Sequence, residues 1–166
     1  MDPKTGVRIR PTRPTDRDGV RAFTIEQWCG EFVTAHGTVY YPDRLPGFVA
    51  EDSAGEILGL VTYSLDGGDC EVATLNAVQQ RVGIGTALFD AVAEVARGAG
   101  CRRLWLMSTN DNVEALAFYE KRGMRLTAVH RDAVARSRKL KPAIPLAGRY
   151  GIPICDEWEL ELSLIP

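Results

Sequence analysis

Two glycines stand just before a long amphipathic segment, in the stretch QQRVGIGTALFDAVAEVARGAG from Gln79 to Gly100. A glycine loop that follows a strand and opens a helix presents backbone N–H groups at the positive end of the helix dipole. Such a loop suits a phosphate or a pyrophosphate. Gly83 and Gly85 would let the anion approach the main chain. The spacing alone is a weak signal, because a tight turn that packs a helix closely on a strand would use the same glycines.

The familiar nucleotide loops do not match this stretch. Leu88 stands where a dinucleotide-binding loop has its third glycine, and no Gly-Lys-Ser/Thr follows as in a Walker A loop. A nucleotide-binding α/β protein of another kind stays open as an alternative. That alternative predicts that ATP or NAD, and not coenzyme A, protects the protein against melting.

The elements before the glycines read as an antiparallel meander. A strand is expected at Val7 to Pro11, then a helix capped by Thr15 or Asp16 that ends near Trp28. Residues 29–47 mix apolar and turn residues without a clean period, and they predict one irregular helix and loop. Three strands joined by tight turns follow, at residues 47–52, 56–65 and 70–78.

After the glycines the pattern changes to that of parallel strands with helices. Apolar residues recur with a period of 3.6 from Thr86 to Gly98, which predicts a helix. Residues 101–109 predict a central parallel strand. The next helix has Asp111 and Glu114 at the spacing of a capping box and Gly123 as its terminator. A strand at 124–130 follows.

The last part of the chain is expected to hold an inserted helix and loop and then a closing strand. The insertion covers residues 131–155, with a short basic helical stretch and a loop rich in proline and glycine. In the closing strand, Trp158, Leu160 and Leu162 alternate with glutamates and are expected to point inward. The outward positions are assigned to Glu157, Glu159 and Glu161.

Two motifs in this order resemble the signatures of the GNAT superfamily of N-acetyltransferases, which bind acetyl-CoA. The first is Q/R-x-x-G-x-G/A at Gln80 to Gly85, and the second is the N-x-x-A-x-x-x-Y-x-K-x-G run from Asn112 to Gly123. The resemblance covers about residues 7–130, with 156–164 as the final strand. It implies a mixed α/β fold of the GNAT type in a single domain over residues 1–166. The implied central sheet has about seven strands, with an antiparallel N-terminal meander, parallel strands 4 and 5 splayed apart, and about four flanking helices.

By this resemblance, the pyrophosphate of coenzyme A would lie on the glycine loop, and pantetheine would run beside strand 4 like an extra strand. Asn112 would bond the cofactor and Tyr119 would face the thiol. The cofactor-binding residues implied in this way are Leu75, Asn76, Ala77, Gln80, Arg81, Val82, Gly83, Ile84, Gly85, Thr86, Asn112 and Tyr119. Two features depart from the family. NAVQQ stands where an Asp-Pro-Glu-like segment is frequent, and the insertion is longer than the usual turn between the last two strands.

Acetyl transfer to an amine needs a neutral nucleophile, an oxyanion donor and a proton for the thiolate. Tyr119 is the candidate acid, because a phenol beside the sulfur can protonate it without a strongly shifted pKa. Glu71 is the candidate base. On strand alternation it should share a face with Ala73 and Leu75, although a glutamate that is merely solvated is an equal alternative. His130 is a weaker candidate for the base and His36 weaker still.

The remaining groups are assigned by position. A main-chain N–H of strand 4 around Asn76 or Ala77 is expected to meet the oxyanion. Five cations could attract the phosphates of the cofactor: Arg81, Arg102, Arg103, Lys121 and Arg122. Carboxylates interleaved with aromatic residues would suit a cationic amine acceptor. These residues are Glu26, Trp28, Phe32, Tyr40, Tyr41, Tyr150, Asp156 and Trp158, of which Trp158 fits the core better.

Composition sets the remaining bounds. The chain has 166 residues and a net charge of -2, which argues against a general nucleic-acid binder. Four cysteines without a CxxC pair and histidines without metal-ligand spacing predict no metal and a reducing, cytoplasmic setting. No apolar run is long enough for a membrane span.

The sequence therefore predicts an acyltransferase that moves acetyl from acetyl-CoA to a small-molecule or peptide amine in a ternary complex. No cysteine stands in a motif for a covalent acyl-enzyme. A non-catalytic sensor of acyl-CoA with the same fold is the alternative, because the cofactor motif is clear and the base is not. The 131–155 insertion is expected to cover the pocket or to form a homodimer contact.

Overall fold

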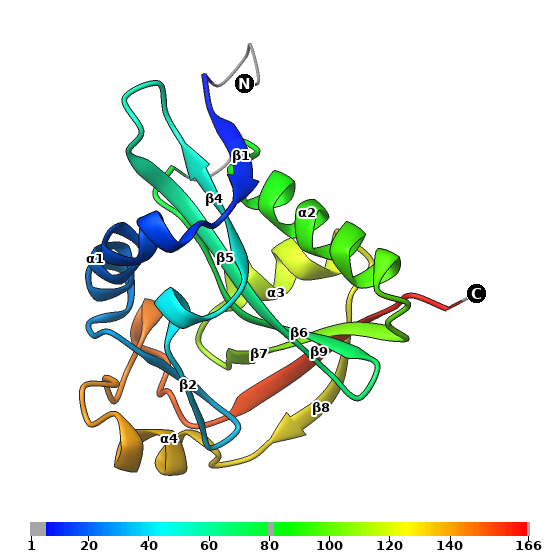
Figure 1. The fold of residues 1–166 in the computed structure, drawn as a ribbon. Helices are drawn as coiled ribbons and strands as arrows, with labels where there is room; N and C mark the ends of the chain where they lie inside the picture. Colours follow the sequence, from blue (N-terminus) through cyan, green and yellow to red (C-terminus); the bar gives the residue numbers. More distant parts are fainter. Residues whose placement is uncertain (1–5, 80–81, 166) are drawn as a thin grey trace.

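A seven-stranded sheet forms the centre of the computed structural model, which describes residues 6–79 and 82–165. The sheet has the order β1-β4-β5-β6-β7-β9-β8 (Figure 1). Its strands are β1 (Arg8–Pro11), β4 (Gly47–Glu51), β5 (Ile57–Asp66), β6 (Asp69–Ala77), β7 (Arg103–Thr109), β8 (Arg125–His130) and β9 (Glu157–Ser163). All neighbours are antiparallel except β6 and β7, which are parallel. The predicted mixed sheet with an antiparallel N-terminal meander is confirmed.

The two parallel strands separate along their length. They pair from Asp69 with Arg103 to Val72 with Leu106. Beyond this point β6 continues to Ala77 and β7 to Thr109, but the two strands are no longer paired. The fourth and fifth of the predicted sheet strands, at residues 70–78 and 101–109, correspond to β6 and β7, and the splay predicted for them is therefore present.

Helices cover both faces of the sheet. On one face lie α2 (Ile84–Gly98) and α3 (Val113–Glu120), and on the other lies α1 (Arg17–Trp28) (Figure 1). The α2 face contains the larger core, in which Val61, Leu88 and Leu104 are fully buried. The α1 face has a smaller core that includes Phe23 and Leu60. The described residues also form α4 (Val134–Leu140) and three short 3-10 helices, η1 (Pro14–Asp16), η2 (Pro42–Arg44) and η3 (Arg149–Gly151).

Residues 29–47 contain a β-hairpin, so the predicted irregular helix was wrong. β2 (Val33–Ala35) pairs with β3 (Thr38–Tyr40). The two-residue turn is His36-Gly37, with φ of 42° and 78°. Two positive φ values make a type I′ turn, whose twist matches that of paired strands. The strands are only three residues long, too short to show a convincing alternation.

Element ends differ in detail from expectation. α2 begins at Ile84, two residues before Thr86, and α3 is capped by Asn112, whose side chain accepts a hydrogen bond from the Ala115 N–H. The predicted capping box of Asp111 and Glu114 is therefore wrong. Asp111 instead accepts a hydrogen bond from the Thr109 hydroxyl at 2.6 Å.

The insertion between β8 and β9 is tied to the rest of the fold at the end of α4 and at its own C-terminal end. Lys141 donates to the carbonyls of Trp28 and Phe32, at 2.5 and 2.7 Å, and so caps the end of α1. Burial lowers the pKa of this lysine. At the other end, the Asn110 side chain accepts from the N–H groups of Cys155 and Asp156. These contacts hold α4 and its loop against the α1 face.

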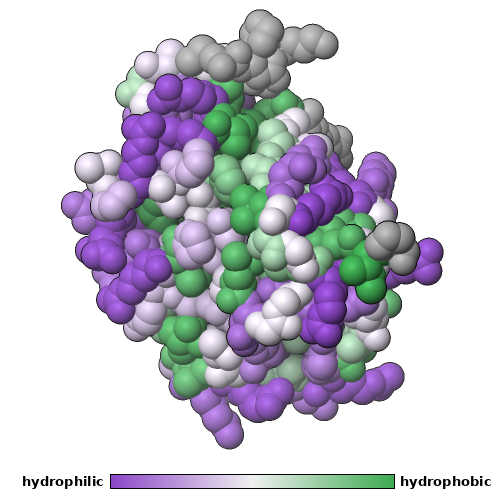
Figure 2. All heavy atoms as spheres, turned by 45° about the vertical axis from the view of Figure 1, so that its right-hand side comes forward, coloured by the Kyte–Doolittle hydropathy of each residue, from purple (hydrophilic) through white to green (hydrophobic). Residues whose placement is uncertain are grey.

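No helix in residues 6–79 and 82–165 is long and apolar enough to cross a membrane. Figure 2 shows one face of the molecule, with hydrophilic side chains around its margin and smaller hydrophobic areas between them.

Candidate active site

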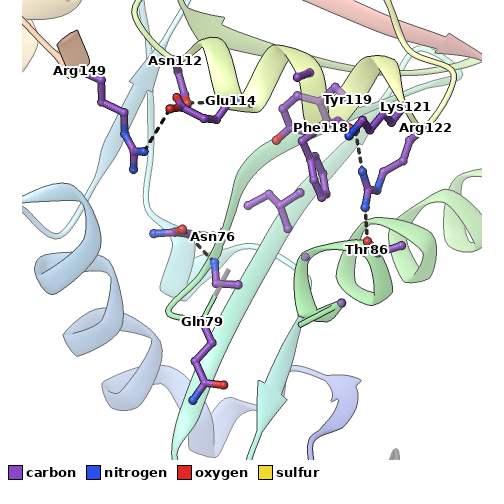
Figure 3. A pocket seen from close by; sticks show the side chains of 16 residues that line it. Asn76, Gln79, Thr86, Asn112, Glu114, Phe118, Tyr119, Lys121, Arg122 and Arg149 are labelled. Carbon is purple, nitrogen blue, oxygen red and sulfur yellow. Dashed lines mark hydrogen bonds and ion pairs between the residues drawn. The ribbon is translucent and has the colours of Figure 1, made fainter. Parts of the chain in front are cut away.

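A pocket of about 490 Å³ lies between the end of β6, the start of α2 and the length of α3 (Figure 3). It sits where β6 and β7 have separated. Its lining comprises Leu75, Asn76, Ala77, Gln79, Gly83, Gly85, Thr86, Asn112, Glu114, Ala115, Ala117, Phe118, Tyr119, Lys121, Arg122 and Arg149.

Most of the residues predicted to bind a cofactor meet at this pocket. Eight of the predicted positions line it: Leu75, Asn76, Ala77, Gly83, Gly85, Thr86, Asn112 and Tyr119. Val82 is exposed nearby, whereas the Ile84 side chain belongs to the core. Gln80 and Arg81 lie outside the described residues.

The start of α2 offers main-chain donors to the pocket. Gly83 caps the helix with φ of 90°, and the first hydrogen bond of the helix runs from the Ala87 N–H to the Gly83 carbonyl at 3.0 Å. The amides of the residues between them lie in the first turn, where a helix has no internal acceptors. A Cβ at Gly83 would meet no atom within 4 Å. The glycine is therefore needed for its backbone conformation, and the space beside it is open.

Arg122 places a cation at the same helix start. Its guanidinium donates to the Thr86 hydroxyl and to the Phe118 carbonyl, and it stacks on the Phe118 ring at 3.4 Å (Figure 3). Burial lowers its pKa. Its Nε is buried without a hydrogen-bond partner among the described residues. A buried unpaired donor in a pocket lined by helix amides favours an anionic ligand.

Tyr119 lies deep in the pocket. Tyr119 is 8% exposed, and its ring packs against Phe89 and Phe118. Burial raises the pKa of the phenol, so the hydroxyl keeps its proton at neutral pH. Figure 3 shows the hydroxyl oxygen turned towards the open space between α3 and β6.

The insertion reaches the opposite rim of the pocket, which sequence reasoning missed. Arg149 lines the pocket, and its guanidinium lies 3.8 Å from the Glu114 carboxylate on α3 (Figure 3). The Tyr150 hydroxyl donates to the same carboxylate. Gly148 packs so closely on Asp111 that a Cβ there would lie 1.8 Å from a carboxylate oxygen. A loop position carries no periodic signal that would have revealed these contacts.

A β-bulge in β6 overturns the predicted face of Glu71. Thr62 pairs with Thr74 while Tyr63 pairs with Val72, so Ala73 is an extra residue. Because one extra residue reverses the alternation, Glu71 does not share a face with Leu75. Glu71 lies on the α1 face with Thr74 and Asn76, whose amide donates to Gln27 of α1 at 2.7 Å.

After the bulge, the N–H groups of β6 point alternately to β5 and to the open edge of the strand. The Val78 N–H donates to the Leu58 carbonyl on β5. By alternation the amide of Asn76 also points to β5, and those of Leu75 and Ala77 point to the open edge. The Ala77 N–H bonds to the Asn76 side chain at 2.9 Å. Leu75 therefore presents the open-edge amide that lies nearest the separation of the strands.

Glu71 anchors a compact polar cluster on the α1 face. Its carboxylate lies 2.8 Å from His36 Nε2 and accepts a hydrogen bond of 2.7 Å from the Tyr40 hydroxyl. The hydrogen bond to Glu71 raises the pKa of His36 above 6.5, and Glu157 raises it further. Burial, followed by the contact with Glu71, raises the pKa of Tyr40. His36 and Tyr40 come from the hairpin that the sequence pattern did not reveal.

Glu157 does not point to solvent as predicted. It is 3% exposed and accepts hydrogen bonds from the Ser137 hydroxyl and from the His36 N–H, at 2.8 and 2.9 Å. The face of β9 opposite the core is covered here by α4 and the hairpin. Strand alternation therefore predicted the correct face for Glu157 but wrongly predicted that it is exposed. Trp158, Leu160 and Leu162 belong to the core, as expected.

Several other candidates lie away from this site. His130 bonds to Glu159 at 3.0 Å on β8, which is at the edge of the sheet. Arg103 is engaged by carboxylates, with Asp69 at 2.8 Å and Glu161 at 2.9 Å, near the paired end of β7. Arg102 contacts Asp69 as well. Of the five cations considered, Lys121 and Arg122 line the pocket.

Comparison of the sequence with known proteins identifies one protein family. Residues 14–124 match the model of the acetyltransferase (GNAT) family. The uncharacterized protein YdhI of Bacillus subtilis (strain 168) is 44% identical over 149 residues, which are 90% of this chain and 93% of that protein.

Solved structures show the same fold. An IAA acetyltransferase from Bacillus cereus ATCC 14579 aligns with a TM-score of 0.69 at 19% identity, over 95% of this chain and 99% of that one. A GNAT family acetyltransferase from Elizabethkingia anophelis, solved with acetyl-CoA bound, aligns with a TM-score of 0.68 at 19% identity, over 96% and 99%.

Proposed function

The chain belongs to the GNAT acetyltransferase family, and from this we propose that it transfers acetyl from acetyl-CoA to a primary amine by direct attack in a ternary complex. One observation carries the proposal. Tyr119 lines the pocket on the α3 face of the sheet, and Glu71 lies on the α1 face, one residue before the last paired position of β6 and β7. An amine that enters from the α1 face would thus attack a thioester whose sulfur departs towards α3.

In this proposal the pocket holds the cofactor by its phosphates. The first-turn amides of α2 and the Arg122 guanidinium would bind the pyrophosphate, because both are donors with unused capacity. Pantetheine would run along the open edge of β6, where the Leu75 amide is available. Bound in this way, acetyl-CoA supplies an activated acyl group with a tolerable leaving group.

Tyr119 would act as the general acid. Its buried phenol keeps its proton, and its hydroxyl faces the pocket. A neutral donor at this place can protonate the departing sulfur. The Leu75 N–H would donate to the oxyanion that develops on the attacked carbonyl, at no reorganisation cost.

Glu71 would act as the general base. It stands one residue before the last paired position of β6, next to the place where the strands separate. Its carboxylate is buried, and the described ion pairs give it no lysine or arginine partner. A carboxylate in this position is available for the proton of an entering ammonium group.

The acceptor would bind between the hairpin, α1 and the insertion, which together cover the α1 face. The aromatic residues Tyr40 and Trp105 and the carboxylate of Glu71 suit a cationic amine. We infer that the chain works as a single domain and that residues 131–155 form part of the acceptor wall.

Release of free coenzyme A in the presence of a panel of primary amines tests the proposal. The panel contains a polyamine, an amino sugar, amino acids and short peptides with a free N-terminus, and a thiol reagent reports turnover. We expect release that depends on one class of amine. Tight binding of acetyl-CoA without amine-dependent release would overturn the transferase proposal in favour of a sensor.

A variant tests where the pyrophosphate binds. Gly83→Val should weaken acetyl-CoA binding, because valine disfavours a φ of 90° and would obstruct the first-turn amides. Gly98→Val is the matched control, since a Cβ there meets no atom within 4 Å and the residue lies at the other end of α2. Isothermal titration calorimetry measures both. Equal affinities in the two variants would argue against this placement.

A further inference from the structure

The Glu71 carboxylate is separated from solvent by one ionisable ring. The side chain of Glu71 is 9% exposed, whereas that of His36 is 28% exposed. Among the described residues, His36 is also the one basic side chain in ion-pair contact with Glu71. Its Nε2 faces the carboxylate and its Nδ1 lies 3.3 Å from the hydroxyl of the exposed Thr38. The ring therefore connects a covered carboxylate with the outside.

The proposed reaction releases one proton per turnover. An acceptor amine enters as an ammonium ion, the new C–N bond forms, and the C–S bond breaks. The nitrogen loses two protons on its way to a neutral amide. One of them replaces the proton that Tyr119 gives to the sulfur, and the other leaves as H⁺. A base that accepts the second proton must return it to water before the next turnover.

We propose that His36, as its Nδ1–H tautomer, takes this proton from Glu71 at Nε2 and releases the Nδ1 proton to solvent. Proton exchange with water then converts the resulting Nε2–H tautomer back to the Nδ1–H tautomer, so that Nε2 can accept again. The inference rests on the proposed function and assigns His36 as a positioning and relay residue that acts through Glu71. The two ring nitrogens suit this task, because an imidazole can gain a proton at one nitrogen and lose one at the other.

The hairpin holds the ring in place. His36 occupies the first position of the type I′ turn, its N–H is bound by Glu157, and its ring packs on Trp105 with centroids 5.4 Å apart. Tyr40 contacts the same Nε2 at 3.0 Å. A non-glycine residue at positive φ is uncommon and is often found where a side chain must be aimed.

Titratable groups from four strands surround His36. Glu71 of β6 and Tyr40 of β3 contact the imidazole ring itself. Glu157 of β9 accepts from the main-chain N–H of His36, and the Arg103 guanidinium of β7 lies 5.1 Å from the ring of Trp105, on which His36 packs. The two carboxylates favour the protonated imidazole, so the ring is able to receive a proton. The relay needs the neutral ring at the start of each cycle, so its rate should rise as pH increases through the pKa of His36.

Two substitutions remove the relay and keep the turn. Asparagine tolerates positive φ, so His36→Asn preserves the hairpin without a titratable ring. His36→Gly also fits the turn and leaves room for added imidazole. His130→Asn is the matched control, because His130 also bonds a glutamate but lies at the sheet edge. Steady-state kinetics use the amine identified by the panel, in dilute buffer.

We expect kcat to fall by roughly 100-fold in His36→Asn and His36→Gly, within the range for loss of a proton-transfer group. The KM for the amine should change much less. Imidazole should restore the turnover of His36→Gly, and the rising limb of kcat with pH that belongs to His36 should disappear in His36→Asn. His130→Asn should behave as the native protein.

The outcomes separate the relay from the function on which it rests. Full activity in His36→Asn, or a loss in His36→Gly that imidazole leaves unchanged, overturns the relay while the transferase stands. Full activity in Glu71→Gln overturns the base and the relay together. A panel in which no amine is acetylated removes the proposed function and this inference with it.

Discussion

At the scale of single residues, the two side chains proposed for proton transfer lie in different environments. Tyr119 is enclosed by aromatic rings, and the described residues offer its hydroxyl no hydrogen-bond partner. Glu71 is held by two polar side chains from the hairpin. The apolar enclosure raises the pKa of the Tyr119 phenol and keeps it a neutral donor, whereas the Glu71 side chain offers acceptor oxygens. The two residues are therefore suited to opposite roles.

Removal of the Tyr119 hydroxyl tests the acid. Tyr119→Phe should lower kcat by about 100-fold or more, as expected for the loss of a general acid. The affinity for acetyl-CoA should be nearly unchanged, because the ring still packs. Kinetics and calorimetry measure the two effects. Tyr63→Phe is the control, since Tyr63 of β5 stacks on Phe48 of β4 and does not line the pocket. Equal losses of turnover and affinity would exclude the role.

The pKa of His36 can be measured without any substrate. We expect it above 6.5, because the Glu71 carboxylate stabilises the protonated ring. Its contribution to folding stability is therefore complete below the pKa of an unfolded histidine and is lost as the pH rises through the folded value. NMR titration of the imidazole signals in His130→Asn, which leaves one histidine, reports the value. Glu71→Gln should lower it, and an unchanged pKa would show that the pair is not formed.

At the scale of elements, one extra residue in β6 determines the geometry of the site. A bulge bends its strand and increases the local twist. Ala73 lies directly after Val72, where the pairing with β7 ends. We infer that the bend opens the gap into which pantetheine fits.

Deletion of Ala73 should restore a regular β6, let it pair further with β7, and abolish acetyl-CoA binding. The matched control is deletion of Thr127, the extra residue between Leu126 and Ala128 at the β8–β9 edge. Circular dichroism checks that both variants fold, and calorimetry measures binding. If deletion of Ala73 leaves the affinity intact, the bulge does not create the gap.

The sequence predicted the elements that have long, regular patterns. The periodicity of α2 and the glycines before it indicated both the helix and the pocket. The hairpin escaped because three-residue strands carry little pattern and His-Gly is a weak turn signal. The bulge escaped because alternation assumes no extra residue, and the wrong face of Glu71 followed from it.

Contacts between distant segments were beyond the reach of local patterns. Glu157 was predicted to face solvent because the groups that bury it, Ser137 and the hairpin, come from other parts of the chain. Arg149 stands in an irregular loop, where composition gives no direction to a side chain. The family motifs indicated the cofactor side of the site much better than the acceptor side for this reason.

At the scale of the whole molecule, the N-terminal strand is fastened by a charge network. Arg10 donates to Glu51 on β4 and to Asp16 at the start of α1. Arg8 bonds Glu51 as well. The network joins the first strand to both the sheet and the helix on its α1 face.

Acid should weaken this fastening. Arg10 and Arg8 lower the pKa of Glu51 from 4.5 to about 2, and Arg10 also lowers the pKa of Asp16. The stabilisation is therefore present above the unfolded pKa and is lost as the pH falls towards 2. The free energy of unfolding is measured with urea between pH 6 and about pH 3. It should change less with pH in Arg10→Met than in the native protein. Arg97→Met, which breaks an exposed pair with Glu94, is the control and should keep the native dependence. Identical slopes in all three proteins would exclude the network as the cause.

The gap between β6 and β7 has a consequence for the order of events in turnover. In the proposed ternary complex the cofactor lies on the α3 face of the sheet and the amine on the α1 face, so free coenzyme A would depart past α3 and the acetylated amine past the hairpin. Neither departure has to wait for the other. We therefore expect each product to inhibit competitively against its own precursor, in the pattern of a random sequential mechanism.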